Sequence, residues 1–190
     1  MLDAPVARRA VEVTTREPRV ESVEIYGVPV EVVRPRDAAV RPAFVFVNGA
    51  HPLRRKEPVV HRLSRGLARA GFVVVVPDLP GLGEGEITAE LPEALARVTR
   101  YAADRPDVRG GRVALVGAST GASIAIIVAG RRELAERISV VAAVAPFASL
   151  EKMVCLATTR FYGDGGRFVP YDVSDLSKRV VARSLVAALE

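Results

Sequence analysis

The sequence predicts an α/β protein built on a mostly parallel sheet with helices on both faces. Four short, continuously apolar runs have the length and Val-rich composition of strands that are buried on both faces. They alternate along the chain with amphipathic helical patterns, an order that places successive strands parallel in one sheet. No internal repeat or low-complexity tract interrupts this order.

The elements are expected in the following order. Val20 to Tyr26 and Val28 to Val33 show a period of about two with a break at Gly27, which predicts a two-stranded hairpin or meander. The apolar strands then fall at 43–47, 72–76, 112–116 and 138–145. The helices between them fall at 58–70, 91–101 and 121–130. Beyond Pro146 the sequence predicts helices over 150–157 and 177–189, an aromatic, glycine-rich loop over 161–172, and no further strand.

A chain of 190 residues is long enough for one hydrophobic core and too short for two ordinary domains. We expect a loose lead-in over residues 1–18, a core over 19–146 and a helical, cap-like segment over 147–190.

The composition, 49% apolar and 26% charged, is typical of a soluble globular protein. The net charge of +5 comes mainly from arginines interspersed with acidic residues, which predicts a solvated surface and no nucleic-acid partner. Cys155 stands alone, so we expect no disulfide and no metal or redox motif, and we place it in a buried helix position. No apolar segment reaches the length of a membrane span and no signal-peptide pattern is present, so we expect no membrane partner and a cytoplasmic location.

The most informative stretch is Gly117-Ala118-Ser119-Thr120-Gly121, which follows an apolar strand and opens an apolar helix. This is the context that a G-x-S-x-G nucleophile elbow requires. A serine on so sharp a turn leaves no room for side chains two residues either side, and glycines occupy both places. We therefore expect Ser119 to be exposed at the carboxyl end of a strand, near helical N–H groups that favour a developing negative charge.

Three motifs together resemble the α/β-hydrolase family, over about Val20 to Ala145. VFVNGAHP resembles the loop after the third strand of that family, with Asn48-Gly49-Ala50 in place of the more usual His-Gly-x. VVVVPDLPGLGEGE resembles the segment after the fourth strand, whose Asp and glycines shape the rim of the site. VALVGASTGAS resembles the elbow.

The resemblance implies a serine esterase or lipase that acts on a small, ester-like substrate without a cofactor or metal. Ser119 corresponds to the nucleophile. The backbone N–H groups of Thr120 and Ala50 would form the oxyanion hole, and Asn48, Gly49 and His51 would lie at the rim.

The chain departs from the family pattern in its histidines. In the family the nucleophile is followed along the chain by an acid and then by a histidine. The only histidines here, His51 and His61, both precede Ser119. We expect His61 on a helix surface and His51 at the rim, where it shapes the loop or contacts substrate. Glu151 and Asp164 are candidates for the acid by position only.

This departure predicts an incomplete hydrolase, either an N-terminal portion of a longer protein or a natural truncation. The family continues after its sixth strand with a cap and two strands that carry the acid and the histidine. The last strand expected here, 138–145, would then be an apolar edge, which a missing C-terminal segment or a second chain would cover.

Two other functions are compatible with the sequence. One is a binding or interaction protein that keeps the fold without catalysis, favoured by the lack of a histidine after Ser119. The other is a nucleotide-dependent oxidoreductase, because VALVGASTGAS also resembles the opening of short-chain dehydrogenases. Against the second, Ser123 occupies the place of the last glycine and no Tyr-x-x-x-Lys follows.

Overall fold

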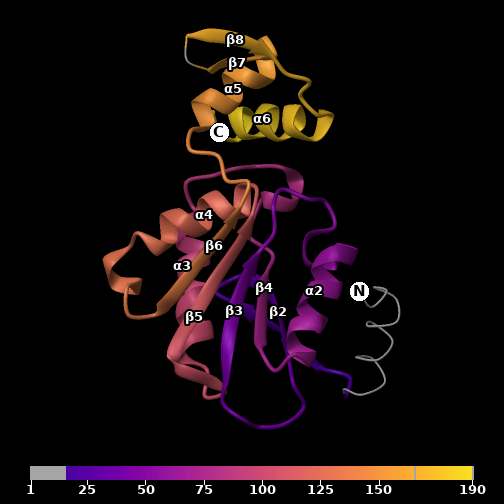
Figure 1. Cartoon of the computed structure of the whole chain (residues 1–190), viewed down its shortest axis with the longest axis vertical. Coiled ribbons are helices and arrows are strands. Elements are labelled where there is room, and N and C mark those ends of the chain that lie inside the picture. The colour runs from indigo at the N-terminus through magenta and orange to yellow at the C-terminus, as the bar shows by residue number, and fades with distance from the viewer. Residues whose placement is uncertain (1–15, 165, 190) are drawn as a thin grey trace, which may run out of the picture.

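The computed structural model describes residues 16–164 and 166–189. Its centre is a six-stranded sheet with the order β1-β2-β4-β3-β5-β6 (Figure 1). The strands are β1 (Arg19–Ile25), β2 (Val28–Arg34), β3 (Arg41–Val47), β4 (Val73–Pro77), β5 (Val108–Ala118) and β6 (Ile138–Val144). Strands β3 to β6 run parallel, whereas β2 pairs antiparallel with both β1 and β4. The predicted mostly parallel sheet and its antiparallel hairpin are confirmed.

Helices cover both faces of this sheet, as predicted. They are α2 (Pro58–Arg69), α3 (Leu91–Asp104) and α4 (Thr120–Ala129), and single 3₁₀ turns lie at Arg54–Lys56, Leu82–Glu84 and Arg132–Leu134. Against α3 and α4 the sheet buries a large core that includes Leu95, Leu115 and Val128. On the opposite face a smaller cluster joins α2 to β2 and β4. Apolar residues do not all lie on the buried sides of these helices, because Val59 and Leu63 of α2 and Ile126 and Ile127 of α4 are exposed.

Strand β5 begins four residues before the predicted start. Its first residue, Val108, pairs with Arg41 of β3, and the register shifts before Val113. Gly110 and Gly111 have φ values of 64° and 61°, a left-handed conformation that glycine adopts without steric cost. These two glycines form an irregularity inside the strand. They also interrupt its apolar sequence, so the apolar run alone did not predict the first part of β5.

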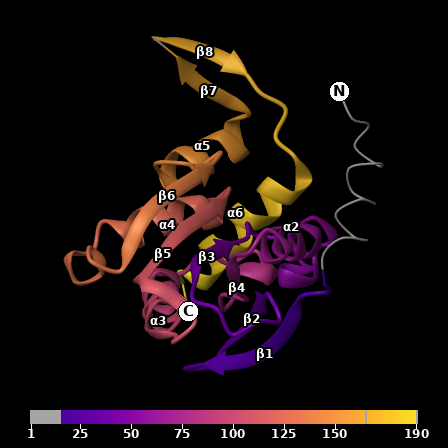
Figure 2. The same ribbon diagram turned by 60° about the horizontal axis from the view of Figure 1, so that its bottom comes forward.

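The C-terminal segment, residues 147–189, is not wholly helical, which corrects one expectation. Between α5 (Leu150–Thr159) and α6 (Asp175–Ala187) the chain forms a hairpin of β7 (Phe161–Asp164) and β8 (Arg167–Pro170) where a loop was predicted. Phe161, Tyr162 and Phe168 favour extended backbone, and the tight turn between them suits glycine. Figure 2 shows the hairpin projecting beyond α5.

Helices α5 and α6 lie over the carboxyl ends of the parallel strands (Figure 1). The Ser184 hydroxyl, buried on α6, accepts a hydrogen bond of 3.0 Å from the N–H of Ile87 in the loop after β4. Cys155 on α5 is exposed, so its expected burial is wrong. The expected lead-in over residues 1–18 falls mostly outside the described residues.

Candidate active site

The chain bends sharply at Ser119, which lies between the end of β5 and the start of α4. Its φ of 51° and ψ of −123° are a conformation that non-glycine residues rarely adopt and that costs of order 1–3 kcal/mol. A Cβ on Gly117 would lie 2.5 Å from the carbonyl oxygen of Gly121. A Cβ on Gly121 would collide with the carbonyl oxygens of Val47 and Asn48. Only glycine fits at both positions, because the obstructing atoms are backbone.

The loop after β3 packs directly against this bend. A Cβ on Gly49 would approach the Ser119 Cβ to 3.2 Å. The Asn48 side chain fixes the loop, because its Nδ2 donates to the Arg54 carbonyl at 3.1 Å and its Oδ1 accepts from the Gly49 N–H at 2.9 Å. An asparagine here supplies both a donor and an acceptor to its own loop.

Two backbone N–H groups remain free beside Ser119. Among the described residues, neither the Ala50 N–H nor the Thr120 N–H donates a hydrogen bond, and the Ser119 hydroxyl has no partner. The Thr120 N–H is at the first position of α4, where a helix leaves its N–H groups unbonded. Ser119 itself is exposed. The site thus offers an unpartnered hydroxyl and two available donors.

A largely buried ion pair between Asp78 and Arg55 stabilises the loop after β3. The Asp78 carboxylate, after β4, accepts from the Arg55 N–H at 2.9 Å and pairs with the Arg55 guanidinium. These side chains are 7% and 19% exposed respectively, so solvent screens the contact little. A second pair joins Arg54 to Glu84. The sequence indicated Asp78 as a residue that shapes the rim, but it gave no sign of its arginine partner.

These groups open into a pocket of about 230 Å³. Its polar wall comes from the two turns, and its other wall is mostly apolar, formed by the C-terminal segment, Ser177 included, and by Ile87 of the loop after β4. The turns contribute Asn48, Gly49, Ala50, His51, Ala118, Ser119 and Thr120. The apolar wall includes Ile87, Phe147, Leu150, Met153, Leu176, Val180 and Val181. Such a combination of an apolar lining with a few placed polar groups is typical of small-molecule sites.

Ser123, which the sequence did not indicate as a structural residue, joins this segment to the core. The Ser123 hydroxyl on α4 donates to the Phe147 carbonyl and accepts from the Phe147 N–H, both at 2.9 Å. It therefore fixes the start of the C-terminal segment beside the pocket. Its only sequence signal is a hydroxyl one helical turn after Ser119.

The two histidines lie in different places. His51 lines the same pocket as Ser119, but its Nδ1 accepts a hydrogen bond of 3.3 Å from the Leu53 N–H. The neutral ring then carries its proton on Nε2, which makes that nitrogen a donor. His61 is exposed on α2, as expected. No described histidine hydrogen-bonds to Ser119.

The two acid candidates do not lie with the serine. Glu151 is exposed in the first turn of α5, and it is Leu150 and Met153 of that helix that line the pocket. Asp164 ends β7 in the projecting hairpin (Figure 2). Position along the chain therefore brought neither residue to the site.

Among the described residues no group of three or more His, Cys, Asp or Glu side chains is arranged to hold a metal ion. In the same part of the chain, no helix combines the length and the apolar character that crossing a membrane requires.

The chain belongs to the α/β hydrolase family, whose family model matches residues 44–188. A solved structure similar to it is a brefeldin A esterase, described as a bacterial homologue of human hormone-sensitive lipase, with a TM-score of 0.62 and 20% identity over 98% of this chain and 62% of that one. A hyperthermophilic esterase from the archaeon Pyrobaculum calidifontis has a TM-score of 0.64 and 21% identity, over 95% and 63%. A dienelactone hydrolase from Anabaena variabilis has a TM-score of 0.58 and 19% identity, over 75% of this chain and 68% of that one.

At these identities the likeness shows the fold alone. The chain spans about 62% of the length of the first of these proteins. A search of curated protein sequences found no match.

Proposed function

We propose that this chain carries the nucleophile and the oxyanion hole of a serine hydrolase that cleaves ester-like acyl bonds. The observation that supports this proposal is the unpartnered Ser119 hydroxyl, which shares one pocket with the two free N–H groups of Ala50 and Thr120. The strained backbone at Ser119 also supports it, because strain of this kind is concentrated at functional sites.

In the proposed reaction the Ser119 oxygen attacks the carbonyl carbon of the substrate and loses its proton to a base. The carbonyl oxygen becomes negative and accepts hydrogen bonds from the Ala50 and Thr120 N–H groups. The alcohol then leaves with a proton, and water hydrolyses the acyl-serine. Each oxyanion donor in such a site contributes roughly 3 kcal/mol of transition-state stabilisation.

The proposal assigns the base to a group outside these 190 residues, in a later segment or a second chain. The His51 Nδ1 already accepts the Leu53 N–H, and His61 is exposed elsewhere. His51 would then donate a hydrogen bond to a substrate oxygen and leave the Ser119 proton to another group.

The dimensions of the pocket favour a small, apolar acyl or alkoxy group. A volume of about 230 Å³ is smaller than that of most drug-sized ligand sites, and the C-terminal segment contributes an apolar wall. The similar structures named as esterases agree with an ester substrate.

The test is labelling with a fluorophosphonate, with and without imidazole as an added base. Ser119 forms the bond to phosphorus, fluoride leaves, and imidazole takes the proton. We expect 100 mM imidazole to accelerate labelling at least about tenfold, because a general base contributes 10²–10⁴-fold when it is well placed. Fragment masses should locate the adduct on Ser119 and not on the hydrogen-bonded Ser123, and Ser119→Ala should remove it. Labelling that is absent, or that persists in Ser119→Ala, would reject the proposal.

A second function, a non-catalytic binding protein, is favoured by one observation: no described histidine hydrogen-bonds to Ser119. It predicts a ligand for the 230 Å³ pocket without turnover. Imidazole-dependent labelling of Ser119 would decide against it.

A further inference from the structure

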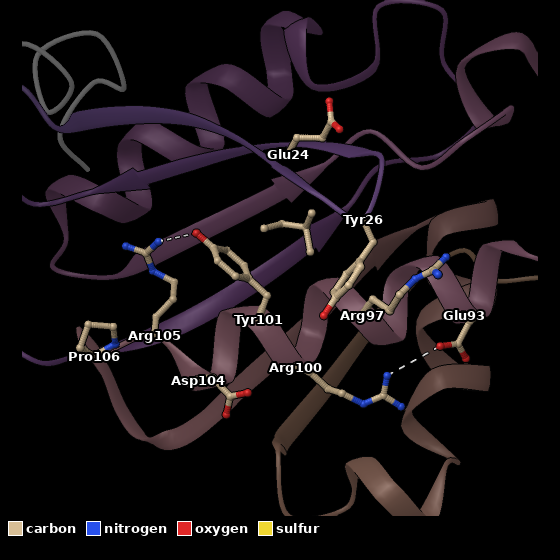
Figure 3. Close-up of a pocket in the computed structure, with 10 residues that line it drawn as sticks. Glu24, Tyr26, Glu93, Arg97, Arg100, Tyr101, Asp104, Arg105 and Pro106 are labelled. Atoms are coloured by element: carbon tan, nitrogen blue, oxygen red, sulfur yellow. Dashed lines mark hydrogen bonds and ion pairs between the residues drawn. The ribbon is translucent and has the colours of Figure 1, made fainter.

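A second, larger hollow of about 1060 Å³ lies between the β1–β2 turn and α3 (Figure 3). It shares no lining residue with the pocket at Ser119. Its apolar surface comes from Ile25 and Tyr101, which pack on the main core. Arg97, Arg100 and Tyr26 stand around it. The hollow therefore combines an apolar surface with aromatic rings and guanidinium groups.

Arg97 carries a charge at this hollow and has no ion-pair partner within 4 Å among the described residues. Its guanidinium carbon lies 5.9 Å from the centre of the Tyr26 ring, within the range of a cation–π contact. It forms no ion pair with any residue that the structure describes, and its buried Nε lacks a hydrogen-bond partner there. The guanidinium is thus oriented by a ring and left without a carboxylate.

The acids nearby are engaged elsewhere or point away. The Glu93 carboxylate binds Arg131 at 2.5 Å, and the Asp104 carboxylate binds Arg137 at 2.5 Å. Arg100 reaches Glu93 and Glu133 only at 3.7 and 3.6 Å. The hydrogen bond from Arg131 lowers the pKa of Glu93, which keeps it ionised and paired. Glu24 points away from both Arg97 and Arg100 in Figure 3. An incoming anion would therefore meet Arg97 and one loosely held guanidinium, that of Arg100.

Tyr26 is held beside this charge at a cost. It is 79% exposed and has a φ of 49°, which is a genuine outlier for a bulky residue. Asparagine or glycine would adopt this turn conformation more readily. A strained, exposed aromatic ring next to an unpaired cation is the kind of feature that a binding site preserves.

We propose that this hollow binds a ligand that combines a planar aromatic ring with one acidic group. The ring would lie over Ile25 between Tyr26 and Tyr101, and the acidic group would pair with Arg97 and Arg100. The proposal does not depend on the chemistry at Ser119, because the two pockets have separate linings.

The probe is 2-naphthoate, which has no ester bond, titrated into the ¹⁵N-labelled chain. We expect saturable shifts at the amides of Tyr26, Arg97 and Arg100, with a dissociation constant of about 1 mM for a ligand of this size. Arg97→Gln should weaken binding about tenfold, because it removes a charge-assisted hydrogen bond. Arg100→Gln should weaken it about threefold, and Tyr26→Asn should weaken it while the chain remains folded.

Arg109→Gln is the matched control, because this exposed arginine lies outside the hollow. One neutral analogue and one non-aromatic analogue test the two required features of the ligand, its acidic group and its aromatic ring, separately. Equal binding of 2-naphthamide would overturn the acidic requirement, and equal binding of cyclohexanecarboxylate would overturn the aromatic one. Shifts confined to the Ser119 pocket, or no shifts at 10 times the expected constant, would overturn the site.

Discussion

Single residues decide whether the Ser119 bend can exist. Gly117 and Gly121 let β5, α4 and the loop after β3 approach within backbone contact, so a methyl group at either place has nowhere to go. The positive φ of Ser119 is a further local cost, which the surrounding packing must offset. The same contacts that create this strain also place the hydroxyl in the open pocket.

We expect Gly121→Ala to lower the free energy of unfolding by about 3 kcal/mol, because the obstructing Val47 and Asn48 oxygens are main-chain atoms. Gly66→Ala is its matched control. Gly66 is exposed within α2 with open space around it, so alanine there should raise stability by roughly 0.5 kcal/mol. Urea unfolding of both variants gives the comparison. Equal effects would show that the crowding at the bend is not the decisive factor.

Tyr26 offers a second prediction at this scale. Its φ of 49° belongs to a turn that asparagine suits, so Tyr26→Asn should raise the free energy of unfolding by about 1 kcal/mol. Tyr26→Phe keeps the ring and the strain and should leave stability nearly unchanged. The melting temperatures of the two variants measure the difference. A destabilised Tyr26→Asn would mean that the ring's contact with Arg97 outweighs the strain.

Among the elements, a charged network joins the carboxyl end of β2 to β1 and to the amino end of β5. Arg105 and Asp107, before β5, form a two-bonded pair at 2.9 and 2.8 Å. Arg34 of β2 lies 3.6 Å from Asp107 and 2.9 Å from Glu21 of β1. Burial alone would raise the pKa of Asp107, but the hydrogen bonds from Arg105 prevail and lower it. The network thus holds the hairpin to the parallel part of the sheet.

Because the pKa of Asp107 is depressed by folding, its contribution to stability is full above the ordinary carboxyl pKa and disappears as the pH falls through the folded value. Asp107→Asn should therefore cost about 1 kcal/mol at pH 7, a figure that allows for solvent screening. The cost should shrink as the pH falls below about 4. Urea unfolding at pH 7 and pH 3 tests this expectation. A cost that does not change with pH would contradict the assigned ion pair.

At the scale of the whole molecule, β6 leaves the sheet open. It is an edge strand of almost entirely apolar sequence, and Val140 and Val144 on it are 56% and 62% exposed. Helix α2 packs on β2 and β4, which form the other half of the sheet, and so it leaves β6 uncovered. Unpaired backbone and exposed valines together make such an edge prone to pairing with another chain.

We therefore expect the 190-residue chain to self-associate as its concentration rises, and Val140→Lys to reduce the association, since charge on an edge strand opposes pairing. Sedimentation velocity over a range of concentrations measures both. Glu136→Gln, close to β6 but outside it, raises the net charge by one unit as Val140→Lys does, and so controls for the change in net charge. A strictly monomeric wild-type chain would contradict this expectation and the need for a covering segment.

The parts of the fold that could be predicted are those with strong local sequence patterns. The parallel strands and the Ser119 bend were predictable because Val-rich runs and two obligatory glycines reflect strictly local constraints. The β7–β8 hairpin was missed, although Phe161, Tyr162 and Phe168 flank its turn, because each strand has only four residues, too few for a clear alternating pattern. At the site, Asn48, Gly49, Ala50 and His51 line one pocket with Ser119, and their roles there stay predictions.

The long-range partners were not predictable in the same way. The pairing of Asp78 with Arg55, the Ser123 contacts and the position of Arg97 over Tyr26 depend on loops meeting in space, which no sequence spacing encodes. Glu151 and Asp164 were candidates for the acid because of their position along the chain, and the structure does not place them with Ser119. Order along a chain does not place side chains in one pocket.

The most direct test of the central claim is a crystal structure of the chain after fluorophosphonate treatment with imidazole. The account predicts a covalent bond from the Ser119 Oγ to phosphorus, with the phosphoryl oxygen about 3 Å from the backbone nitrogens of Ala50 and Thr120. An adduct on another residue, or a phosphoryl oxygen that is turned away from both nitrogens, would contradict it.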